Sequence, residues 1–132
     1  MNQYAAIATV MLVAMATPAA ATGEIVCRGV ESDAIRVTLG FGTLPVLSVI
    51  SARIETQEAT YQLSEGGNAD LIRFGDGAFL NDGLIARFTD DIVNEILAEL
   101  RIVNMDDGRH FASVGLLRLP GKAAHALVCE GP

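Results

Sequence analysis

Residues 110–129, HFASVGLLRLPGKAAHALVC, predict two strands joined by a tight turn. Proline fixes φ at the first central position of a turn, and glycine supplies a positive φ at the second. Residues 119–122, Leu-Pro-Gly-Lys, therefore predict a type II turn. We expect this turn to join a strand over 110–119 to a strand over 123–129 in an antiparallel hairpin.

The hairpin ends at Cys129, and Cys27 is the only other cysteine. An even number of cysteines in an exported chain is typical of a disulfide. A bridge requires the two Cα atoms to lie within about 7 Å, so the first and last segments must lie side by side. A redox role would use closely spaced thiols, which the sequence lacks. We therefore predict one structural disulfide.

An apolar leader accounts for the high hydrophobic content of 51%. Residues 1–21, MNQYAAIATVMLVAMATPAAA, contain no charged side chain, and Ala19 and Ala21 are the small residues that a signal peptidase requires. We predict a secretory signal peptide over 1–21, cleaved before Thr22, and a single β-rich domain over 22–132. The run is shorter than the roughly 20 residues of a spanning helix, so no stable membrane anchor is expected after cleavage. Because no Lys or Arg precedes the apolar run, an uncleaved leader is the alternative.

All charged side chains lie after this leader, so the net charge of −7 belongs to the predicted domain. An acidic surface repels phosphate backbones and anionic lipids, and nucleic acid is therefore not an expected partner. The charge favours a basic protein partner in the cell envelope, although it also serves solubility. We expect a periplasmic or secreted protein, whose oligomeric state the sequence leaves open.

Alternating apolar and polar residues predict further strands, which glycine-rich turns separate. The expected strands cover 34–41, 46–54, 60–63, 70–74 and 84–88. The turn signatures are Gly66-Gly67, Gly75-Asp76-Gly77, Asn81-Asp82-Gly83 and Asp106-Asp107-Gly108.

Residues 89–103 combine two patterns. Apolar side chains at helical spacing follow Thr89, which is a candidate N-cap, and alternation returns toward the end of the segment. We predict one short helix near 91–96, followed by a strand to about Asn104 that pairs with residues 110–119.

About eight short strands in a chain whose ends must touch predict a mostly β fold. Antiparallel strands in sequence order, with the last beside the first, make a small up-and-down β-barrel. The disulfide would link the first and last strands, where the barrel closes. A two-sheet β-sandwich is the alternative. Both architectures remove exposed strand edges.

The sequence offers no candidate catalytic residue, metal site or cofactor motif. His110 and His125 are the only histidines, and the predicted hairpin places them at different levels, so they do not form a metal site. Acidic turns such as Asp106-Asp107 lack the spacing of a calcium loop. No Gly-x-Ser-x-Gly elbow is present, and we do not expect an enzyme.

Arginine dominates the basic residues, since Lys122 is the only lysine. Most arginines occupy polar positions of the expected strands, which favours cross-strand pairs with carboxylates on the outer face. A ring of inward-facing arginines that binds an anion is the alternative. The arginines in question are Arg28, Arg36, Arg53, Arg73, Arg87, Arg101 and Arg118.

A signal peptide, a small barrel and a bridge from the first strand to the end of the chain resemble the periplasmic inhibitors of C-type lysozyme. That family carries an early Tyr-x-Cys motif and a central Ser-Gly-x-x-Tyr loop that plugs the enzyme's cleft. Here Ile25 and Val26 precede Cys27, and residues 75–79, Gly-Asp-Gly-Ala-Phe, contain neither the serine nor the tyrosine. The resemblance covers architecture only, and it implies a barrel that binds an enzyme without assigning any inhibitory residue.

These observations predict an exported, non-enzymatic binding protein that engages a protein partner through its loops. If the protein instead carries a small apolar or anionic ligand, the barrel interior should contain a lined cavity. If it is an accessory subunit of an envelope complex, one barrel face should carry a flat apolar patch. Candidate loop contacts are Phe41, Leu44, Phe79, Leu80 and Lys122.

Overall fold

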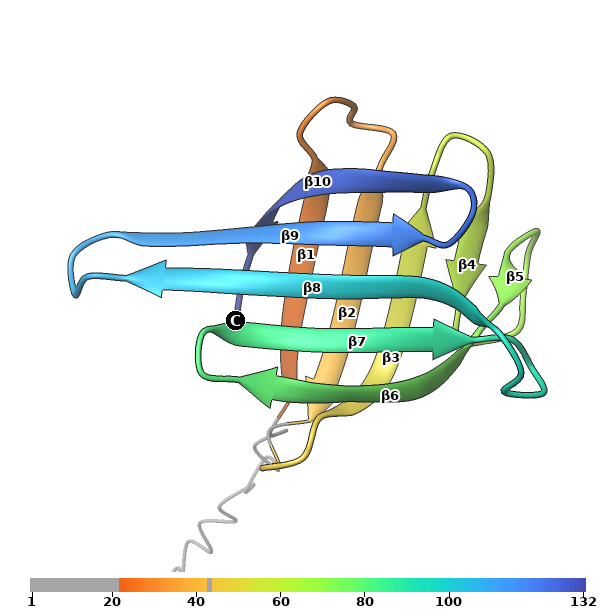
Figure 1. Ribbon diagram of the computed structural model, residues 1–132, viewed down its shortest axis with the longest axis horizontal. Coiled ribbons are helices and arrows are strands. Elements are labelled where there is room, and N and C mark those ends of the chain that lie inside the picture. Colours follow the sequence, from red (N-terminus) through yellow and green to blue (C-terminus); the bar gives the residue numbers. More distant parts are fainter. Residues whose placement is uncertain (1–21, 43) are drawn as a thin grey trace, which may run out of the picture.

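A computed structural model describes residues 22–42 and 44–132, in which every regular element is a strand. Ten strands join in one sheet (Figure 1), so the mostly β prediction is confirmed with ten strands in place of about eight. The strands are β1 (Thr22–Gly29), β2 (Arg36–Gly42), β3 (Ser48–Glu55), β4 (Thr60–Gln62), β5 (Asp70–Leu71), β6 (Arg73–Leu80), β7 (Gly83–Thr89), β8 (Ile96–Asp106), β9 (Phe111–Leu119) and β10 (Ala123–Glu130).

Nearly all neighbours in the sheet are neighbours in the chain, and the last strand pairs with the first. The order is β5-β4-β3-β2-β1-β10-β9-β8-β7-β6, with antiparallel pairing except between β4 and β5. Figure 1 shows β6–β10 crossing in front of β1–β4, with β10 bending from one layer toward the other. The sheet is nearly closed into a small barrel, as predicted, and its two edge strands are β5 and β6.

The predicted disulfide is confirmed at the junction of the two layers. Cys27 of β1 and Cys129 of β10 are direct partners in the antiparallel register, and their Cα atoms lie 4.0 Å apart. Both residues face the core and are buried. The disulfide therefore links β1 and β10 covalently, next to the backbone hydrogen bonds that pair these two strands.

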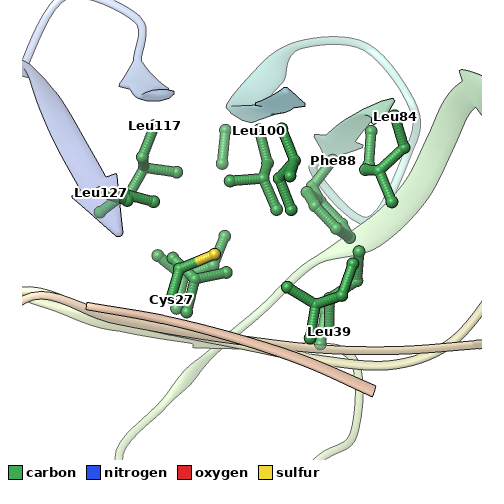
Figure 2. Close-up of a cluster of buried hydrophobic side chains, with 14 of the residues drawn as sticks. Cys27, Leu39, Leu84, Phe88, Leu100, Leu117 and Leu127 are labelled. Atoms are coloured by element: carbon green, nitrogen blue, oxygen red, sulfur yellow. The ribbon is translucent and has the colours of Figure 1, made fainter. Parts of the chain in front are cut away.

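Inner-face side chains fill the space between the two layers. Figure 2 shows Leu100 and Leu117 opposite Cys27 and Leu39, which come from the other layer. These leucines and Phe88 are fully buried. Burying a leucine or phenylalanine stabilises a fold by about 1.5–3 kcal/mol relative to leaving it exposed, so this interior is the main source of stability.

The C-terminal hairpin forms as expected. The Lys122 N–H donates a hydrogen bond to the Leu119 carbonyl at 2.9 Å. Gly121 has a φ of +73°, which fits the second central position of a type II turn. In the strands that follow, His125 pairs with Leu117. The local turn chemistry of proline and glycine thus determines this register.

The predicted helix near 91–96 is wrong, because residues 91–95 belong to the loop between β7 and β8, and Ile96 is the first residue of β8. The Asp90 carboxylate accepts a hydrogen bond from the Asn94 N–H at 2.7 Å, and Val93 adopts a positive φ of 56°. A short acidic side chain that binds nearby backbone competes with helix formation. Ile92 is exposed rather than part of a buried helical face. The strand predicted after the helix is confirmed as β8.

The turn predicted at residues 75–77 is also wrong, because these residues lie within β6. Pairing with β7 shifts register between Phe74 and Asp76. A Cβ atom on Gly77 would lie 2.5 Å from the Ile85 carbonyl oxygen. Glycine here permits a close backbone approach between paired strands and does not mark a chain reversal.

The predicted signal peptide, residues 1–21, lies outside the described residues. The first described strand begins at Thr22, which is the predicted start of the mature chain. Over the described ranges, the structure contains no helix that is long and apolar enough to cross a membrane. Cleavage of the leader and the single domain over 22–132 stay predictions.

Candidate binding surface

The predicted loop contacts do not all come together in the structure. Phe41 of β2 and Phe79 of β6 meet edge to face, with ring centroids 5.7 Å apart. Phe41 is buried and therefore not available as a contact, because the inward alternation of β2 continues to this residue. Leu44 is exposed and Leu80 is partly exposed. Lys122 lies in the β9–β10 turn, well away from the β6–β7 turn in Figure 1.

A row of apolar side chains lies on the outer face of β8, β9 and β10. Val114 of β9 pairs with Val103 on one side and with Val128 on the other. Met105 and Leu116 extend the row along β8 and β9, and Leu116 is 62% exposed. We call these five residues the apolar face.

The apolar face departs from the usual pattern of an antiparallel sheet. Such sheets commonly alternate apolar residues toward the core with polar residues toward solvent. In β9, Leu117 is buried as expected, but the outward residues Val114 and Leu116 are apolar as well. Contiguous exposed apolar patches that are bordered by polar residues mark interaction sites. The outer face of β9 is therefore the strongest candidate for a binding surface.

Two arginines border the apolar face. Arg28 of β1 pairs with Val128, and Arg101 of β8 pairs with Leu116. Within residues 22–42 and 44–132, neither guanidinium forms an ion pair within 4.0 Å. Both can therefore donate hydrogen bonds to carbonyl or carboxylate groups of a bound partner.

Two strand arginines, Arg87 and Arg118, form the predicted cross-strand ion pairs. Arg87 Nε donates to Glu99 at 2.7 Å, and its Nη1 lies 3.2 Å from Asp76. The hydrogen bond to Glu99, followed by that to Asp76, raises the pKa of Arg87. Arg118 lies 3.4 Å from the same Glu99 carboxylate. Since Arg118 shares the outer face of β9 with Leu116, this charged cluster borders the apolar face at one end.

The acidic residues at the tip of the β8–β9 hairpin bind backbone groups, as turn residues do. The Asp106 carboxylate accepts a hydrogen bond from the Gly108 N–H at 2.7 Å. The Asp107 carboxylate accepts from the N–H groups of Arg109 and His110, at 2.9 Å and 2.7 Å. These two bonds, in that order, are the main causes that lower the pKa of Asp107.

Acidification should loosen this hairpin tip. A carboxyl group whose pKa is lowered by folding stabilises the fold above the ordinary aspartate pKa, and that contribution is lost as pH falls through the lowered value. We expect the Asp107 carboxyl carbon to titrate below about 3.9, the value of an unperturbed aspartate. An NMR titration should show the Arg109 and His110 amide signals shifting with the same midpoint. In D107N this shared transition should disappear, and a midpoint at or above 3.9 would contradict the assignment.

Metal ligands do not gather in the described part of the chain, where no three His, Cys, Asp or Glu side chains could hold an ion together. His110 lies at the tip of the β8–β9 hairpin, whereas His125 pairs with Leu117 near the other end of β9. The two imidazoles therefore do not converge.

Comparison with protein-family models, with curated proteins and with solved structures finds no match. Residues 75–79, which lack the serine and the tyrosine of the lysozyme-inhibitor loop, lie inside β6. The resemblance to those inhibitors thus contributes no site residue.

Sequence reasoning missed the apolar face. Its signal was present in residues 113–117, Ser-Val-Gly-Leu-Leu, where the positions expected to point outward, Val114 and Leu116, are apolar. Their pairing with Val128 across the predicted turn would have placed these side chains in one patch.

Proposed function

We propose that this protein is an exported, non-enzymatic interaction protein of the cell envelope that binds a protein partner through the apolar face. The observation that carries this proposal is the exposure of Val114, Leu116 and Val128 on adjacent strands of one sheet. A rigid sheet presents such side chains with little conformational entropy left to lose on binding.

The arrangement matches one of the predicted alternatives, an accessory subunit of an envelope complex, which requires a flat apolar patch on one barrel face. Core side chains fill the space between the two layers, which argues against a ligand carried in the barrel interior. Binding through the loops is supported less well, because Phe41 is buried and leaves Leu44 and Phe79 as the exposed apolar loop contacts.

Export is supported by two independent features. A disulfide is typical of oxidising compartments outside the cytoplasm, and the bridge between Cys27 and Cys129 joins the two terminal strands. The leader over residues 1–21 has the composition of a signal peptide. The ten described strands all lie after this leader, so its removal would delete none of them.

The partner should present an apolar surface with acceptor groups at its border. Leu116 and its neighbours would fill the centre of the interface, and Arg28 and Arg101 would donate to carbonyl or carboxylate groups around it. At longer range the net charge of −7 favours encounter with a protein of net positive charge. We accordingly propose a basic envelope protein with an apolar docking surface.

Leu116→Glu should reduce capture of this partner at least about tenfold, because a carboxylate would be desolvated at the centre of an apolar interface. The experiment immobilises the oxidised protein and its variants, and quantifies captured envelope proteins by mass spectrometry. The substitution lies on the outer face, so thermal unfolding should remain close to that of the parent protein.

Ile50→Glu is the matched control. Ile50 of β3 is 59% exposed, nearly as much as Leu116, but it lies in the other layer. The control should retain every protein that the parent captures specifically. Equal loss in both variants, or no loss in Leu116→Glu, would overturn the proposed surface.

A further inference from the structure

A cleft of about 590 Å³ opens at one end of the barrel. It lies between the β1–β2 loop, the β3–β4 loop and the β9–β10 turn, three segments that are far apart in sequence. Ile35, Tyr61 and Leu119 are buried residues that contribute to its lining. Most of its lining residues belong to loops, whereas Ile35, Tyr61 and Leu119 are also members of the hydrophobic core.

Polar groups converge in this cleft. The Lys122 ammonium lies 3.3 Å from the Tyr61 hydroxyl oxygen and 5.9 Å from the centroid of the same ring. His125 also lines the cleft and belongs to the strand positions of β10 that alternate inward. Among the described residues, Lys122 has no carboxylate within 4.0 Å. Its positive charge is therefore available to a ligand.

We propose that this cleft binds a small carboxylate that has an apolar body. The ligand carboxylate would accept hydrogen bonds from Lys122 and from the Tyr61 hydroxyl, while its apolar body would lie against Ile35 and Leu119. A small-molecule site usually combines apolar contacts with a few convergent polar groups, and the lining of this cleft contains both kinds of residue. The exposed carboxylates of Glu31 and Glu58 also line the cleft, and their repulsion opposes any ligand that carries a second negative charge. This inference does not rest on the proposed protein partner, because it uses a different surface.

Octanoate and octan-1-ol form a matched pair of probes that differ in the carboxylate. Since Lys122 is the only lysine, protein labelled with ¹³C-lysine gives the signals of this one side chain. We expect octanoate to shift the Lys122 Cε signal saturably in the full oxidised chain, and octan-1-ol to shift it little. Isothermal titration then gives the affinity for each variant.

Lys122→Gln should weaken octanoate binding about 10- to 100-fold, as expected for loss of a hydrogen bond between charged groups. Lys122→Arg should retain most of the affinity. Arg109→Gln, which removes one positive charge at the tip of the β8–β9 hairpin, is the charge-matched control and should change the affinity less than twofold. The proposal fails if octan-1-ol or octylammonium binds as tightly as octanoate, or if Lys122→Gln stays within twofold of the parent.

Discussion

Replacing both cysteines, in C27A/C129A, should lower the free energy of unfolding by about 3–5 kcal/mol. The bridge closes a loop of 102 residues in the unfolded chain. In the chain-entropy model, a loop of about 100 residues corresponds to about 4.7 kcal/mol, and loss of a native bridge from a small domain typically costs 2–5 kcal/mol. Replacing both residues avoids a single reactive thiol, and alanine avoids a buried hydroxyl group at these apolar positions.

Urea unfolding of the parent and of C27A/C129A measures this effect. The β1–β10 pairing should persist in the variant, because the backbone hydrogen bonds and the core do not depend on the sulfur atoms. Reducing agent should lower the stability of the parent to near that of the variant, and it should leave the variant unchanged. A loss below about 1 kcal/mol would mean that the unfolded chain already holds its ends together.

Phe88→Ala should cost about 3–5 kcal/mol, the range for truncating a buried aromatic residue. Phe88 is fully buried between the layers, and its ring meets that of Phe74 edge to face at a centroid distance of 6.1 Å. Truncation removes this contact and leaves a cavity that the crossing strands cannot close without moving. Urea unfolding should give a lower midpoint with an unchanged slope.

Phe111→Ala is the control for this substitution. Phe111 is 56% exposed at the start of β9, so the same truncation there should change the free energy of unfolding by less than about 1 kcal/mol. Similar losses at both positions would contradict the placement of the core between the two layers.

Local chemistry made the two ends of the fold predictable. The turn at Pro120 and Gly121 needs only those two residues, and the pairing of the terminal strands follows from two cysteines in an exported chain. The prediction of a helix near 91–96 is wrong because it rests on the spacing of hydrophobic residues alone. That spacing takes no account of the Asp90 side chain, which accepts hydrogen bonds from the backbone and interrupts regular structure. The prediction of a turn at Gly75 and Gly77 is wrong because glycine occurs both in turns and where paired strands approach closely. The sequence alone does not distinguish these two uses of glycine.

The candidate sites were harder to predict from the sequence than the fold. The apolar face depends on the register of three strands, so Val114 and Leu116 could be taken for core residues until their outward direction was known. The cleft depends on three loops that are distant in sequence, and Tyr61 and Lys122 meet across 61 residues. The sequence predicts Lys122 as a contact for a protein partner, whereas its place beside Tyr61 in the cleft favours a small carboxylate.

Site-specific photocrosslinking in the cells that produce the protein can show whether the apolar face contacts a partner. A photoreactive amino acid at position 116 samples the apolar face, and the same residue at position 50 samples an equally exposed site on the other layer. We expect a discrete adduct with one envelope protein from position 116 and none from position 50. An adduct from position 50 without one from position 116 would contradict it.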